Sequence, residues 1–193
     1  MHTYFNLKTI IESRRTVKPP FMNGKKIPDE QVLELVSLAN WAPTHGLTEP
    51  WRFIIYAGMQ VPRFCQEHAK LYEQNTASEK FTQDKYDKLA HMGDQASHII
   101  IAIMHRGQLP AIPQLEEIAA ASCAVQNILL GATAMGIASY WGSGGMAYHP
   151  AMKEYLALPL EDLILGILYL GYTDQAFKAR RNTSIEDKIT LIK

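Results

Sequence analysis

The chain has 193 residues, of which 47% are hydrophobic and 20% are charged, and its 19 basic residues balance its 19 acidic ones. A chain of this length buries roughly 70% of its unfolded surface, which suits one compact domain. The balanced charge provides no field that would attract nucleic acid or anionic lipid, so we expect neither kind of partner.

Apolar spacing and loop signals divide the first half of the chain into elements. A recurrence every three or four residues favours a helix, whereas a continuous β-branched and aromatic run favours a strand. A charged segment with sparse apolar residues is typical of a solvent-facing helical excursion or a lid. In order, we predict a short helix capped by Asn6 and ending near Arg14, a helix from Pro28 to Pro43, a strand over 51–57 and the excursion over 62–92.

In the second half, residues 118–152 contain no Lys, Arg, Asp or Glu, which is long enough to suggest a membrane span. Polar and small residues dilute this stretch, however, so we expect no membrane partner and interpret it as a helix buried in a soluble protein or against a partner chain. The elements predicted here are a strand over 98–104, a helix over 114–136, a strand over 137–141, a short helix from Pro150 and a strand over 163–170.

Strands separated by helices throughout one chain predict an α/β or α+β fold, with helices on the faces of a sheet. The polar, basic tail that follows has no core pattern of its own, and about twenty structureless residues are unusual in a compact domain. Its apolar members favour docking on another subunit over disorder; they are Ile185, Ile189, Leu191 and Ile192.

Two guanidinium groups and a hydroxyl follow the first predicted helix, at Arg14, Arg15 and Thr16. Arginine presents a planar fork of donors, so this tripeptide is a candidate site for a phosphate and its polyol chain. Basic residues are also routine at a helix C-terminus, where they complement the helix dipole. Taken alone, the tripeptide favours that structural role.

The loop between the second helix and the first strand carries Trp41, His45 and Trp51. A loop held by two rigid elements is a common place for function; His45 could donate to a ligand, and the tryptophans could pack beside a flat ring. The alternative is a turn with tryptophans anchored in the core. That alternative is the better one for Trp51, and the two interpretations are balanced for His45.

A glycine-rich segment over 140–147 contains the pattern G-x-G-x-x-A. A dinucleotide-binding fingerprint requires an acid that ends the next strand about 20 residues later. Here Glu161 and Asp162 precede the next strand instead. The segment favours a backbone that approaches a flat ligand closely, which glycine permits, or else a plain turn.

Motifs for side-chain catalysis and metal binding are absent from the sequence, including the Walker A loop, the G-x-S-x-G elbow and H-E-x-x-H. The seven histidines lack zinc spacing, so we expect no metal and no catalytic side chain. Cys65 and Cys123 lie in unrelated contexts, and the first residues lack a signal-peptide layout. Both observations are typical of a cytoplasmic protein.

Taken in order, the three candidate segments, the long helix through Cys123, and Leu170-Gly171-Tyr172 before a basic tail resemble the nitroreductase family, most closely its short members. The ordered set spans nearly the whole chain and is more specific than any single motif. The resemblance implies a three-layer sandwich with a mixed central β-sheet flanked by helices. It also implies a single FMN-binding domain over 1–193, a homodimer with FMN between the subunits, and a tail over 172–193 that extends onto the partner.

The resemblance further implies which residues bind the cofactor. Arg14, Arg15 and Thr16 would hold the FMN phosphate and ribityl chain, and Lys178 and Arg180 would add phosphate contacts. His45 would contact the cofactor from the other subunit. The remaining candidates are Trp41 beside the ring and, along the isoalloxazine, the backbone of Trp141, Gly142, Ser143 and Gly144.

Several residues depart from the family pattern. Glu49 stands where these proteins often carry Gln, Trp41 is bulkier than the usual residue, Gly46 lacks a side chain that could touch the ring, and Thr16 replaces a common Ser. A carboxylate beside a phosphate is unfavourable, so we expect Glu49 to point away or to have another role. These departures bear on substrate choice more than on FMN binding.

The implied activity is FMN-dependent oxidoreduction in a ping-pong cycle. NAD(P)H, a transient reductant, would deliver a hydride to flavin N5, and an electron-poor small molecule such as a nitroaromatic or a quinone would accept it. FMN carries this chemistry, so no side-chain nucleophile is needed. The alternatives are dehalogenation, enoate reduction or flavin breakdown on the same scaffold, or a non-catalytic flavin-binding dimer.

Overall fold

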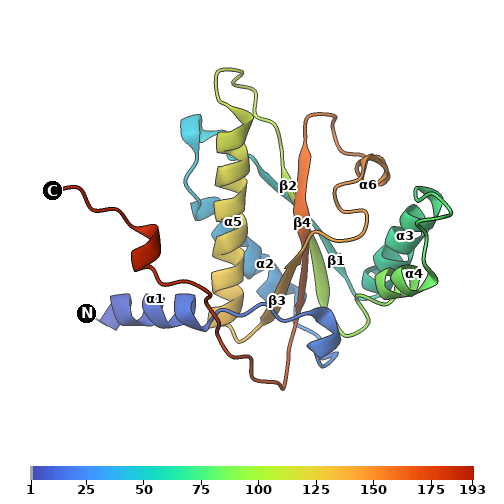
Figure 1. Ribbon diagram of the computed structural model, residues 1–193, viewed down its shortest axis with the longest axis horizontal. Coiled ribbons are helices and arrows are strands. Elements are labelled where there is room, and N and C mark those ends of the chain that lie inside the picture. Colours follow the sequence, from blue (N-terminus) through green and yellow to red (C-terminus); the bar gives the residue numbers. More distant parts are fainter. Residues whose placement is uncertain (1) are drawn as a thin grey trace.

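The computed structural model describes residues 2–193 and shows three layers, with a sheet between two groups of helices (Figure 1). Short 3-10 helices join the main elements at Pro19–Phe21, Leu38–Trp41 (η2), His45–Leu47 (η3) and Glu186–Lys188. The main elements are α1 (His2–Ser13), α2 (Asp29–Ser37), β1 (Trp51–Ala57), α3 (Gln60–Gln74), α4 (Gln83–Ala90), β2 (His98–Met104), α5 (Gln114–Ala134), β3 (Ala138–Gly142), α6 (Pro150–Tyr155) and β4 (Leu163–Gly171).

The four strands lie in the order β1-β2-β4-β3, and each neighbouring pair is antiparallel. The predicted α+β class with helices on both faces is confirmed. Within residues 2–193, the parallel component of the predicted mixed sheet is limited to one isolated bridge, between Thr16 and Ser139. This bridge lies at the edge formed by β3, so the edge is only partly covered.

The central strand β2 explains why its sequence is continuously apolar. Successive side chains point to opposite faces of a sheet. Ile99 and Ile101 lie in the core on the α3 side, whereas Ile100 and Ala102 lie in the core on the α5 side. Both faces of β2 are therefore buried, as the uninterrupted hydrophobic run predicts.

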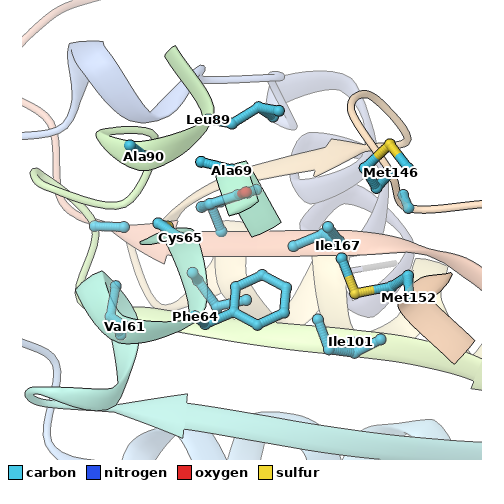
Figure 2. Close-up of a cluster of buried hydrophobic side chains, with 14 of the residues drawn as sticks. Val61, Phe64, Cys65, Ala69, Leu89, Ala90, Ile101, Met146, Met152 and Ile167 are labelled. Atoms are coloured by element: carbon cyan, nitrogen blue, oxygen red, sulfur yellow. The ribbon is translucent and has the colours of Figure 1, made fainter. Parts of the chain in front are cut away.

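The charged segment over 62–92 is an integral layer of the fold, so the expectation of a solvent-facing excursion was wrong. Figure 2 shows Phe64 and Cys65 of α3 next to Ile101 of β2 and Ile167 of β4. The buried residues of α3 recur at three- and four-residue intervals among Lys, Glu and Gln, which makes a single apolar stripe; they are Val61, Phe64, Cys65, His68, Ala69 and Tyr72.

Helix α5 is the one helix within residues 2–193 that is long and apolar enough to cross a membrane. Nearly half of its most apolar window is buried inside this chain, and it packs against β2 and η2. These contacts are those of a core helix, in agreement with the predicted interpretation. Its outer face, which includes Leu115 and Cys123, is exposed.

The N-terminal helix and the C-terminal tail project from the same side of the molecule (Figure 1). Helix α1 begins at His2 and so contains Asn6, which is not the predicted cap, and it has no buried residue. Phe5 of α1 and Leu191 of the tail are 55% and 73% exposed. Both terminal segments therefore present apolar side chains that nothing in the described chain covers.

Candidate functional site

The isolated bridge joins two of the predicted site segments. Thr16 pairs in parallel with Ser139 of β3, and the Val17 N–H donates to the Ser139 carbonyl at 2.9 Å. The basic segment after α1, which comprises residues 14–18, therefore runs alongside β3. Its bridge partner, Ser139, lies two residues before Trp141. Residues more than 120 positions apart in the chain meet at one edge of the sheet.

The basic segment alternates between buried and exposed side chains. Val17 is buried in the core, whereas Thr16 and Lys18 on either side of it are exposed. Within residues 2–193, neither the Arg14 guanidinium nor the Lys18 ammonium has a hydrogen-bond or ion-pair partner. Lys18 was missed by the motif analysis; the two-residue period of an extended segment would have placed it with Thr16.

Arg15 ties the end of α1 to the tail. Its Nε donates to the Phe177 carbonyl at 3.0 Å, and its Nη1 donates to the Glu12 carbonyl at 2.6 Å and to the Arg14 carbonyl at 3.0 Å. These bonds satisfy carbonyls at the helix C-terminus, which is the structural role that the tripeptide alone favoured. They also bring the tail to the basic segment, since Lys178 directly follows Phe177.

The backbone of Trp141 faces the open edge of the sheet. The N–H and C=O of a strand residue point to one side, and the side alternates along the strand. The Ser139 carbonyl points outward to Val17, so the backbone groups of Trp141 point outward as well. Gly142 is buried, and Ser143 and Gly144 continue beyond the strand as an exposed loop.

His68 of α3 supports this glycine loop from inside the molecule. Its Nε2 accepts a hydrogen bond from the Met146 N–H at 2.8 Å, and burial lowers the pKa of His68 to about 4. Gly145 has φ +66°, and a Cβ there would overlap the His68 ring. The loop shape thus requires both the glycine and a neutral imidazole, and no sequence motif marked His68.

His45 lies at the opposite end of α5 from the basic segment. Its Nδ1 contacts the Glu116 carboxylate at 2.7 Å, near the N-terminus of α5. Arg15 lines a pocket with Thr133 and Gly136, at the C-terminal end of the same helix. The 21 residues of α5 span about 30 Å. Within one chain, His45 and the basic segment therefore lie far apart, at opposite ends of α5.

The loop that carries His45 is strained and exposed. Leu47 and Glu49 have φ of +54° and +43°, a region that residues other than glycine rarely adopt. Glu49 is exposed in this loop. Trp41 is 85% exposed and lines a pocket together with Leu7 and Ile10 of α1 and with the C-terminal half of α5.

Solved structures of other proteins share this architecture. A nitroreductase-like family protein from Bacillus cereus superposes with a TM-score of 0.80 at 27% identity, covering 96% of this chain and 95% of that one. An FMN-bound nitroreductase from Bacteroides fragilis gives 0.70 at 20% identity, covering 97% and 98%. The FMN-dependent nitroreductase NfnB from Mycobacterium smegmatis, in complex with NADPH, gives 0.75 at 15% identity, covering 99% and 100%.

The sequence match agrees with these structural similarities. The model of the family described as Nitroreductase family matches residues 11–172, which include the basic segment, His45, Trp141 and the whole sheet. The chain belongs to the nitroreductase family.

Proposed function

We propose that this protein is an FMN-dependent oxidoreductase that uses NAD(P)H to reduce an electron-poor small molecule, such as a nitroaromatic or a quinone. The observation that carries the proposal is the Thr16–Ser139 bridge, which aligns a basic segment with the open edge of β3. One end of the resulting site has the charge for a phosphate, and the other has the glycine-lined backbone for a flat ring.

The basic end fits a phosphate because its cations are available. Arg14 and Lys18 have no partner in residues 2–193, and Lys178 and Arg180 are exposed on the tail that Arg15 holds nearby. A phosphate would accept charge-assisted hydrogen bonds from these groups. The Thr16 hydroxyl, exposed on the same side, would serve the ribityl chain.

The β3 end fits a flat heterocycle because its polar groups belong to the backbone. The Trp141 N–H and C=O face outward, and an added Cβ at Gly144 would meet nothing within 4 Å. A ring that lies along the backbone of Trp141, Gly142 and Ser143 would therefore meet no obstruction at Gly144. Backbone N–H groups in this position would favour negative charge on the ring.

Completion of the site would require a second copy of the chain, and we propose a homodimer. His45 lies away from the basic segment of its own chain, but a two-fold arrangement about the exposed face of α5 would bring the partner's His45 to it. The tail over 172–193 of the single domain would extend onto the partner. The free thiols Cys65 and Cys123 suit a cytoplasmic location.

When bound, FMN supplies N5 as the atom that accepts a hydride from NAD(P)H and donates it to the acceptor in a ping-pong order. The chain itself would bind the phosphate through Arg14 and Lys18 and orient the ring through the backbone of Trp141. His68 would keep the glycine loop in the shape that admits the ring. No side chain is required to act as a nucleophile.

The visible spectrum of the purified protein tests this proposal directly. We expect a yellow protein with one FMN per chain, whose absorbance near 450 nm is lost promptly after anaerobic addition of NADPH. A non-catalytic flavin carrier would be yellow but would not bleach. A colourless protein that does not bind added FMN would contradict the proposal as a whole.

Substitutions at the basic end test the phosphate site. Arg14→Ala and Lys18→Ala should each weaken FMN binding about 10- to 100-fold, which is the typical effect of one charge-assisted hydrogen bond. Riboflavin, which lacks the phosphate, should bind these variants as it binds the unaltered protein. Lys88→Ala, on the distant helix α4, is the control. Equal weakening for FMN and riboflavin would place the phosphate elsewhere.

A further inference from the structure

A β-bulge in β4 lies beside the proposed ring site, at Leu165. Ala102 pairs with Gly166 and the next residue, Ile103, pairs with Ile164, so Leu165 has no partner in β2. A bulged residue leaves the ladder locally unpaired, and bulges often adjust the position of side chains next to functional sites. The Leu165 carbonyl accepts hydrogen bonds from side chains.

Two aromatic side chains donate to this carbonyl. The Trp141 Nε1–H donates to it at 3.0 Å and the Tyr148 hydroxyl at 3.2 Å. Gly166, with φ +145°, allows the indole to lie against β4, because a Cβ at this position would overlap the Trp141 ring. One carbonyl thus fixes two aromatic rings from the two ends of the glycine loop.

These rings line a pocket of about 440 Å³. The volume is within the range of small-molecule sites, and the pocket adjoins the Trp141 end of the proposed ring site. Ile118 and Ser122 of α5 and Lys153 of α6 line the pocket as well. The Lys153 ammonium donates to the Leu160 carbonyl, which leaves it two further hydrogens for a ligand.

We propose that this pocket binds the electron acceptor, as a single flat ring that carries a hydrogen-bond-accepting oxygen. The ring would lie against Trp141 and Tyr148, and its nitro or carbonyl oxygen would accept from Lys153. The site rests on the proposed function, because an acceptor must lie next to the FMN ring. It adds a pocket and two specificity-determining residues, Tyr148 and Lys153, which the family motifs do not contain.

Binding of nitrobenzene to the oxidised holoprotein tests the pocket without any turnover, since the oxidised flavin has no electrons to donate. We expect a saturable change in the flavin spectrum, and tighter binding of nitrobenzene than of toluene, which lacks the oxygens. Tyr148→Ala should weaken nitrobenzene binding about tenfold, because an aromatic contact is lost. Tyr148→Phe retains the ring and should weaken it only about two- to threefold.

Lys153→Met should remove the preference for nitrobenzene over toluene while retaining the binding of both rings. Tyr4→Ala, which alters a tyrosine that is 66% exposed on α1, is the matched control for the Tyr148 variants. Tyr148 is itself 63% exposed, so its truncation should not unfold the protein. Affinities that Tyr148→Ala and Lys153→Met leave unchanged, or a flavin spectrum that nitrobenzene does not alter, would overturn the proposal.

The proposed pocket and the proposed oxidoreductase activity can be contradicted independently of each other. Saturable quenching of tryptophan fluorescence by nitrobenzene measures occupancy of the pocket in FMN-free protein, and we expect Tyr148→Ala to weaken it by the same factor. Loss of NADPH bleaching with this quenching intact would contradict the oxidoreductase and leave the pocket. Normal bleaching with quenching unaffected by Tyr148→Ala would contradict the pocket alone.

Discussion

Two kinds of segment contribute to the candidate site, and they differ in how the chain supports them. The His45 loop and the glycine loop are each supported by a buried polar side chain. The Glu117 carboxylate accepts from the Gly107 N–H and pairs with the Arg106 guanidinium, which fixes the chain next to the His45 loop. His68 fixes the glycine loop in a similar way, because it accepts a hydrogen bond from the Met146 N–H.

The terminal segments, in contrast, have no such support. Helix α1 buries no residue, and within residues 2–193 its last turn is joined to the tail by the side chain of Arg15. Exposed apolar side chains line both segments. The loops are complete within one chain, whereas the termini have the composition of an interface that another surface must cover.

The largest effect in this comparison is expected from Glu117→Gln. Glu117 is 1% exposed and faces Arg106, which is 18% exposed, so the substitution leaves a mostly buried guanidinium without its counter-charge. We expect a loss of about 3 kcal/mol in the free energy of unfolding, at the lower end of the range for a broken buried pair. Urea denaturation of the two proteins measures it.

Glu116→Gln is the matched control, because this neighbouring carboxylate is 48% exposed and pairs with the exposed His45. We expect it to change the free energy of unfolding by less than about 0.5 kcal/mol. If both variants were destabilised equally, the buried pair would not be what supports the His45 end of the molecule.

A smaller effect is expected from charges placed on the tail. Ile189 and Leu191 are 60% and 73% exposed, so changing both to Asp should not destabilise the single chain. In the proposed dimer the same carboxylates would be buried, which should raise the dissociation constant of the dimer at least about 100-fold. Sedimentation equilibrium measures this constant.

The control for the tail is Lys188→Asp, which also adds negative charge to this segment but at a polar position. It should leave the dimer intact. Were the double variant to remain as dimeric as the unaltered protein, the tail would not contact the partner, and the exposure of its apolar residues would need another explanation.

The sequence predicted most of the fold because the buried strands carry their own signal. Residues 99–104 are apolar without interruption, and the structure buries them on both faces. The charged segment over 62–92 was misread because its apolar residues are only a stripe, and Lys and Glu between them lower the average. Asn6 was misread as a cap because the first turn of α1 lacks a strong sequence signal.

The candidate site was only partly predictable, since its local motifs do not encode contacts between distant segments. Arg14 and Trp141 were selected one at a time, but the bridge from Thr16 to Ser139 is a tertiary pairing that no spacing indicates. Lys18 required the knowledge that the segment after α1 is extended, which places it on the same side as Thr16. The role of Tyr148 could be inferred only from its hydrogen bond to the bulged residue Leu165. In the sequence, His68 is an isolated histidine in a charged helix, and only its hydrogen bond to Met146 indicates a role.

The smallest effect concerns His68 and extends the comparison to the glycine loop. Burial lowers the pKa of His68 to about 4 from an ordinary value of 6.5, so the unfolded chain binds its proton more readily. Stability from neutral His68 is complete above pH 6.5 and is lost as the pH falls towards 4. Between pH 7.5 and 5, this loss amounts to about 2 kcal/mol in the free energy of unfolding.

His68→Gln keeps an acceptor for the Met146 N–H without a titrating ring. The fall in the urea midpoint between pH 7.5 and 5 should therefore be smaller in this variant than in His2→Gln, where an exposed imidazole is removed. An equal fall in both variants would show that His68 is not the group whose protonation releases the loop.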